Sequence, residues 1–283
     1  MFALLGQLKR NPLVRYSLIG IITFIILQAI YTPITLGLDD KDISILAITT
    51  ILGLFLFQYF MGASVFHRAF VGHALPAILW ALTFPLLFSW SYTKAFYFYE
   101  FANDFLFGLV LFMGLSAFQY LLTTPLKWTK TMSALFALAN TALSFIPFIQ
   151  IAYYTTTWHC LTPASLLAIY MTNPEEAFGF VKNAAGVVGL VGIAAFFILW
   201  TLFAYWCNLG MRRIVEINPS RPLRKGVLTA AVIAFFIYAP FFLFPKTCII
   251  HNWIDVKEYV AEMQQYNDKH SEIFNSFNLS TQD

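Results

Sequence analysis

The chain has 283 residues, of which 59% are hydrophobic, 18% aromatic and only 11% charged, with a net charge of +3 and a mean hydropathy of +0.70. A soluble domain carries about 25% charged residues, so this composition excludes a water-soluble globular protein. No basic stripe suited to nucleic acid occurs outside the loops that flank the apolar stretches. The composition therefore predicts an integral membrane protein.

Seven apolar stretches are long enough to cross a bilayer as helices. A hydrocarbon core of about 30 Å needs roughly 20 apolar residues in helical form. The stretches are apolar on every face, unlike the alternating segments of a spanning strand. We expect an all-α integral membrane domain over residues 1–250 with about seven transmembrane helices. The expected spans are 16–38, 43–66, 74–93, 105–126, 132–154, 187–211 and 227–245.

The charges of the loops alternate along the chain. Cytoplasmic loops of membrane proteins carry the excess of Lys and Arg. With the N-terminus inside, the inner segments hold 11 of the 17 basic residues and one acidic residue, Glu216. The outer segments hold the other six basic residues and the other 13 acidic ones, so the inner side sums to +10 and the outer side to −7. The pattern predicts an N-in, C-out topology.

The predicted spans hold no ionisable side chain. Ions and polar substrates need such partners at membrane depth, so ion-coupled transport is disfavoured. His67 and His73 fall in one short inner loop. Because residues i and i+6 of a helix point about 120° apart, the sequence favours solvated histidines over a metal-binding pair. We interpret the polar residues of the spans as hydrogen-bonding links between helices; they are Gln28, Gln58, Gln119 and Asn140.

The most informative segment is 155–183, on the outer side between the fifth and sixth spans. Thr162 followed by Pro163 is typical of a helix start. Asn173 followed by Pro174, with an acid three residues after the Asn, is a variant of the capping box. The segment therefore predicts a short interfacial helix and a second helix that starts at Asn173.

Two interpretations of the polar residues in this segment remain open. In the local one, Thr172 and Asn173 are caps, and Glu175 and Glu176 match the dipole of the helix N-terminus. In the functional one, Thr172, Asn173 and Glu176 form a polar cluster at the outer membrane surface, where a lipid headgroup lies.

The run LTPASLLAIYMTNPEEAFGFV resembles a motif of the phosphoethanolamine and phosphoglycerol transferases of the alkaline-phosphatase/sulfatase superfamily, such as lipid A phosphoethanolamine transferases. In that family a multi-span domain carries a pattern like AI-x-x-TN-x-x-EA on an outer segment. Two spans, an amphipathic linker and a periplasmic metal-dependent catalytic domain follow. This chain has the motif, two predicted spans and a linker-like tail in that order. It differs in having five predicted spans before the motif, where the family commonly has three, and Ala168 where many members have Asn.

The resemblance implies a membrane-anchoring, lipid-substrate-binding domain in the bacterial inner membrane. The enzyme would transfer the headgroup of a phosphatidylethanolamine-like phospholipid to a periplasmic glycolipid or glycan. Thr172 and Glu176 match the residues that bind the lipid in the family. The family's nucleophilic Thr and its zinc ligands have no counterpart before Asp283. Zinc and catalysis are therefore expected only from a catalytic domain, in cis or in trans, and no catalytic or metal-binding residue is assigned in this chain.

Residues 251–283 form a polar outer tail. Its apolar residues Trp253, Val256, Val260 and Met263 follow helical spacing. We expect an amphipathic helix, which either packs on the outer ends of the spans or recruits a partner. Two other functions therefore stay open: a non-enzymatic scaffold that recruits a periplasmic partner and, with less support, a lipid or polyprenyl-glycan transporter.

Two of the three cysteines, Cys160 and Cys248, fall on the outer side. An oxidising compartment permits a disulfide there. Spacing alone leaves both a Cys160–Cys248 bridge and two thiols open, because the geometry decides.

Overall fold

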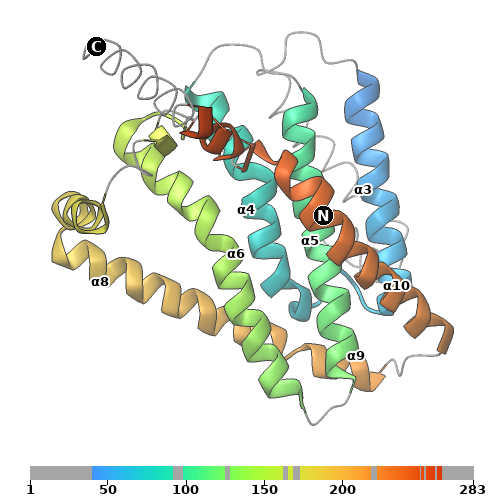
Figure 1. Ribbon diagram of the computed structural model, residues 1–283. Helices are drawn as coiled ribbons and strands as arrows, with labels where there is room; N and C mark the ends of the chain where they lie inside the picture. The colour runs from blue at the N-terminus through green and yellow to red at the C-terminus, as the bar shows by residue number, and fades with distance from the viewer. Residues whose placement is uncertain are drawn as a thin grey trace, which may run out of the picture.

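The computed structural model describes residues 40–91, 98–124, 128–161, 165–167, 173–217, 222–248, 250–251, 253–258 and 260–262. All the regular elements within these ranges are helices (Figure 1), which confirms the all-α prediction for the described chain. The α-helices are α3 (Asp40–Met61), α4 (Arg68–Ser91), α5 (Phe98–Thr123), α6 (Thr129–Thr157), α8 (Pro174–Asn208), α9 (Met211–Ile217) and α10 (Pro222–Tyr238). A π-helix, η2 (Ala239–Leu243), and a 3₁₀ turn, η3 (Phe244–Lys246), continue α10.

Five stretches are long and apolar enough to cross a membrane, so the chain is a multi-pass membrane protein by the length and composition of its helices. They are Arg68–Leu87, Ala102–Thr123, Thr129–Thr157, Val188–Ile217 and Lys225–Lys246. They correspond to the third to seventh predicted spans. The second, 43–66, falls on α3, which has a shorter apolar stretch over Ala47–Met61. The first, 16–38, lies outside the described residues.

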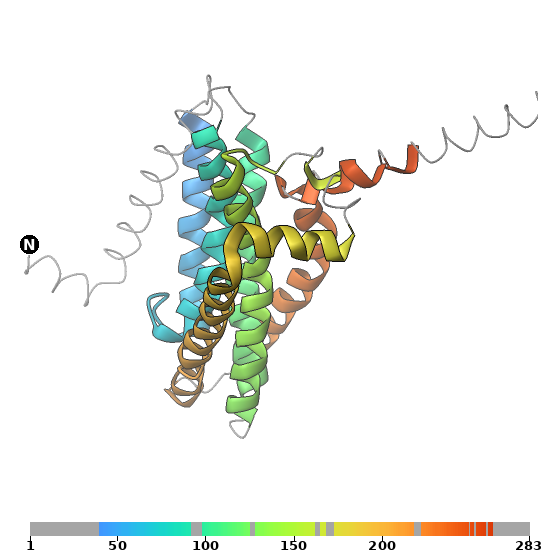
Figure 2. The same ribbon diagram turned by 90° about the vertical axis from the view of Figure 1, so that its left-hand side faces the viewer.

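Helices α4, α5 and α6 pack side by side in the centre of the bundle. Helices α3 and α10 contact α5, and α8 packs on α4 and α6. Figures 1 and 2 show that successive central helices reverse direction, so their connections fall alternately at two ends. We call the end that holds the α3–α4 connection and α9 the inner end, and the opposite one the outer end.

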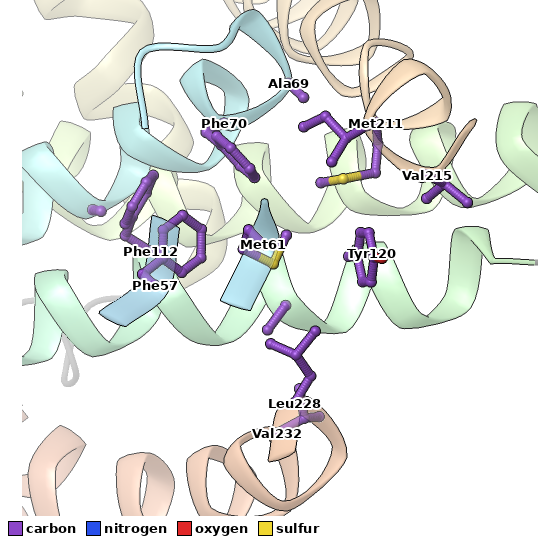
Figure 3. Close-up of a cluster of buried hydrophobic side chains, with 13 residues drawn as sticks. Phe57, Met61, Ala69, Phe70, Phe112, Tyr120, Met211, Val215, Leu228 and Val232 are labelled. Carbon is purple, nitrogen blue, oxygen red and sulfur yellow. The ribbon is translucent and has the colours of Figure 1, made fainter. Parts of the chain in front are cut away.

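A cluster of buried apolar side chains fixes the inner end (Figure 3). It joins α3, α4, α5, α9 and α10. Met61, Phe70, Tyr120 and Met211 are fully buried in it. The rings of Phe57 and Phe70 meet edge to face with their centroids 5.1 Å apart. Since lipid is as apolar as these side chains, close packing rather than burial from water holds the helices together.

Helix α8 consists of two sections that meet at Gly186. Gly186 has φ 67° and ψ 175°, a backbone region that essentially only glycine adopts. The section before Gly186 crosses the bundle, whereas the section after it runs obliquely over α4 and α6 (Figure 2). The predicted helix start is confirmed, because Pro174 is the first helical residue and Asn173 is its N-cap.

Candidate functional site

The predicted lipid-binding residues lie at the start of the crossing section of α8. The Asn173 Oδ1 atom accepts a hydrogen bond of 2.8 Å from the backbone N–H of Glu176. Asn173, Glu175 and Glu176 are exposed. The structure thus brings Asn173 and Glu176 together, while Thr172 lies outside the described residues. The local interpretation accounts for the Asn173 oxygen, and both carboxylates stay accessible for a ligand.

The amphipathic tail packs against the segment that precedes α8. Leu161, Leu166 and Val256 form a buried cluster, against which Trp253 and Tyr153 pack. The Tyr153 hydroxyl donates a hydrogen bond of 2.8 Å to Ser165 Oγ. Of the two roles predicted for the apolar face of the tail, the described residues show packing on the outer end, and Met263 lies outside them. The tail therefore helps to hold the outer segment on α6.

Cys160 and Cys248 also lie at the outer end. Both are buried thiols in the structure. The backbone N–H of Cys248 donates a hydrogen bond of 3.1 Å to Asp104 Oδ1. The disulfide between the two cysteines stays a prediction.

A buried polar network near the inner end differs from the sequence prediction. His73 is not in a solvated loop but on α4, and it is fully buried. Its Nε2 lies 2.6 Å from Gln119 Oε1 on α5, and its Nδ1 lies 3.2 Å from Asn140 Oδ1 on α6. Gln119 Nε2 donates a hydrogen bond to the carbonyl of Asn208, the last residue of α8. The imidazole thus links α4, α5 and α6, and Gln119 extends the network to α8. The prediction that Gln119 and Asn140 join helices is confirmed.

The start of the predicted span explains why the sequence assigns His73 to a loop although it lies on a helix. The predicted span began at residue 74, because Arg68 and two histidines just before it are typical of a loop, whereas α4 begins at Arg68. The spacing of the apolar residues that follow His73 nonetheless indicates that it lies on a helix. His73 shares one helix face with Ala77, Trp80 and Phe84, at helical spacings of four, three and four residues. All three are buried.

Asp104, like His73, lies one residue outside a predicted span and is nonetheless buried in a helix. It is buried on α5 within the membrane-length stretch Ala102–Thr123. With Thr83 and Gln150 it lines a small cavity between α4, α5 and α6 that has room for about one water molecule. The prediction that the spans hold no ionisable group is therefore wrong at His73 and Asp104.

Within the described part of the chain, no group of three or more metal-ligating side chains converges. Comparison with known proteins returns no matching protein family, curated protein or solved structure.

Proposed function

We propose that this chain is the membrane-anchoring, lipid-substrate-binding domain of a phosphoethanolamine-transferase-like enzyme, which moves a phospholipid headgroup to a periplasmic glycolipid or glycan such as lipid A. The proposal starts from the resemblance of the segment 161–181 to that family's outer motif. The observation that carries it is the exposure of Asn173 and Glu176 at the start of the section of α8 that crosses the bundle.

Each residue of the motif would contact a different part of the lipid. Asn173 uses its Oδ1 to cap α8, so its amide nitrogen would donate to a phosphate oxygen. A helix N-terminus favours a phosphate at this place. The Thr172 hydroxyl would add a second donor, and the Glu176 carboxylate would pair with the ethanolamine ammonium. The nucleophile and the zinc would come from the catalytic domain.

Glu176→Gln tests the proposed headgroup contact, and Glu175→Gln is its matched control. Both carboxylates are exposed in the first turn of α8, so both substitutions change the charge at the helix N-terminus equally. Loss of one surface ion pair with a lipid is worth about 1 kcal/mol, which is about fivefold in affinity. We expect Glu176→Gln alone to lower retention of phosphatidylethanolamine, measured by native mass spectrometry.

Headgroup transfer provides the second readout of the proposal. In the chain combined with its catalytic domain, Thr172→Ala and Glu176→Ala are expected to lower transfer, whereas Glu175→Ala is not. Unchanged transfer in the first two variants, or an equal loss of lipid in Glu175→Gln and Glu176→Gln, would contradict the assignment of these residues.

We further propose that the protein lies in a bacterial inner membrane with about seven spans, its N-terminus in the cytoplasm and its C-terminus in the periplasm. The distribution of described charges supports this orientation. The inner end carries Arg68, Lys130, Arg212, Arg213 and Lys225, with the acid Glu216, whereas the outer end carries Glu175, Glu176, Asp255, Glu258 and Glu262, with the bases Lys246 and Lys257.

Cysteine accessibility tests the orientation. In a variant without native cysteines, a membrane-impermeant maleimide added to spheroplasts is expected to label Glu175→Cys and not Lys225→Cys. Both positions are exposed in the structure, so both should react after the membrane is permeabilised. Labelling of Lys225→Cys alone in intact spheroplasts would contradict this topology and support the opposite one, with the N-terminus in the periplasm.

Lipid transport is a second candidate function, favoured by the buried His73 and Asp104. Ionisable residues within spans commonly mark substrate or proton pathways. Movement of a fluorescent phospholipid between the leaflets of proteoliposomes, with its headgroup intact, would support transport. If the Asp104→Asn variant folds but no longer moves the phospholipid, the movement depends on the buried carboxylate of α5.

A further inference from the structure

A basic hollow at the inner end lies far from the outer motif. Phe66 and His67 of the α3–α4 connection line it together with Arg68, the first residue of α4. Leu209 of the turn after α8 and Arg212, Arg213 and Glu216 of α9 complete the lining. The hollow has a volume of about 650 Å³. Two connections that are about 140 residues apart in the chain thus place three guanidinium groups and one carboxylate around one depression.

The arginines are positioned by buried neighbours. Ala69 and Phe70 follow Arg68 and are fully buried, and Met211 precedes Arg212 and is also fully buried. Ala69, Phe70 and Met211 all belong to the buried cluster in Figure 3. Both sides of the basic hollow are fixed by tightly packed core residues rather than by exposed loop ends.

Arg68 is held in one place by two contacts. Its guanidinium carbon lies 5.1 Å from the centroid of the Trp206 ring, a cation–π distance. Its side chain also passes so close over Gly210 that a Cβ there would come within 3.0 Å of the Arg68 Cγ and Nε atoms. The glycine leaves room for the Arg68 side chain to reach across to α9.

The charges around the hollow are unbalanced. Arg212 pairs with Glu216 at 2.7 Å. Neither Arg68 nor Arg213 forms an ion pair with another described residue. Burial, and then the charges of Arg68 and Arg213, lower the pKa of His67. His67 Nδ1 accepts a hydrogen bond from the backbone N–H of Ala69, so its proton is on Nε2, a further donor at the rim.

We propose that this hollow binds a phosphate-bearing anion, and that Arg68, Arg213 and the Nε2–H of His67 are its donors. Planar guanidinium groups suit phosphate oxygens. Trp206, which lies against Arg68, is exposed on α8 together with Leu202 and Phe203, so the hollow adjoins an apolar surface of α8 that suits lipid. The phosphate therefore belongs to an anionic lipid headgroup or to a soluble phosphate, and the test separates these two sources.

The test is a binding titration of the purified chain with phosphatidylglycerol in nanodiscs and, separately, with inorganic phosphate. Each basic residue near a membrane surface contributes about 1 kcal/mol. We therefore expect Arg213→Gln to weaken binding about fivefold and Arg68→Gln/Arg213→Gln about thirtyfold. Glu216→Gln should strengthen binding, because it releases Arg212. Lys225→Gln is the matched control, since it removes one positive charge at the same end outside the hollow.

The results of this titration can be distinguished from those of the experiments on Thr172 and Glu176, because the substituted residues and the ligands differ. Stronger binding of phosphatidylglycerol than of inorganic phosphate, with the expected order of variants, supports a lipid headgroup. Equal binding of both, with the same order, supports a soluble phosphate. Equal losses in Arg213→Gln and Lys225→Gln, or no loss in the double variant, would overturn the proposal. The unfolding midpoint of each variant, which should match that of the unsubstituted chain, excludes misfolding as the cause.

Discussion

His73→Ala is expected to destabilise the membrane domain by about 2–4 kcal/mol, because it combines a cavity with unpaired buried polar atoms. The imidazole is fully buried between α4, α5 and α6. Its removal would leave the side-chain amides of Gln119 and Asn140 without their present partner. The hydrogen bonds themselves contribute little, since such bonds between membrane helices average about 0.6 kcal/mol. The cavity and the orphaned amides account for most of the loss.

The destabilisation can be measured by unfolding in mixed micelles of increasing SDS fraction, followed by circular dichroism. His159→Ala is the matched control, because His159 is exposed at the outer end, and we expect a change below about 0.5 kcal/mol. A double-mutant cycle with Gln119→Leu should show a coupling energy of about 0.5–3 kcal/mol. Equal effects of His73→Ala and His159→Ala, or no coupling, would show that the network does not stabilise the fold.

The network also constrains the proton of His73. A neutral imidazole has one N–H and one acceptor nitrogen. The 2.6 Å contact with Gln119 Oε1 places the proton on Nε2. Nδ1 then needs a donor, which Asn140 supplies when its amide turns to present Nδ2. In the present orientation, Nδ2 of Asn140 is buried and has no hydrogen-bond partner among the described residues. Turning the amide leaves its buried oxygen, rather than its buried NH₂ group, without a hydrogen bond. A buried oxygen without a partner is less unfavourable than a buried N–H without one.

The parts of the fold that the sequence predicts are those governed by local rules. In lipid, every backbone polar group must be bonded within the segment, so a long apolar stretch has to be helical. Five predicted spans correspond to helices for this reason. The start of α8 follows from the side-chain chemistry of Asn173 and Pro174, which acts within four residues. Neither result depends on what the helices touch.

The parts that the sequence misses depend on contacts between distant residues. Residues 179, 186, 189 and 192 are all glycine, and nothing local indicates that Gly186 alone interrupts α8. Burial of His73 depends on Gln119 and Asn140, which lie 46 and 67 residues away. Likewise, the loop charges predict that Arg68 and Arg213 share one side of the membrane. Only the packing of α9 on the bundle brings both to one hollow.

Gly108→Ala is expected to destabilise the domain by about 1–3 kcal/mol through overpacking between α4 and α5. A Cβ at Gly108 would overlap the backbone oxygen of Ala77 and come within 2.9 Å of the Ala81 Cβ. Small residues at such a contact let two membrane helices approach closely. Relief would require α4 and α5 to separate. This would weaken the contact of Trp80 with Phe107, whose rings meet edge to face with centroids 5.0 Å apart.

Gly192→Ala is the control, because it makes the same chemical change in a helix where a Cβ has nothing within 4 Å. Alanine is the better helix former by up to about 1 kcal/mol, so this variant should be slightly more stable than the unsubstituted chain. The two substitutions should therefore shift the SDS unfolding midpoint in opposite directions. Helix propensity alone would shift both midpoints upward. An upward shift in Gly108→Ala would therefore mean that α4 and α5 do not pack through Gly108 and Ala77, and the close contact at the centre of the bundle would be refuted.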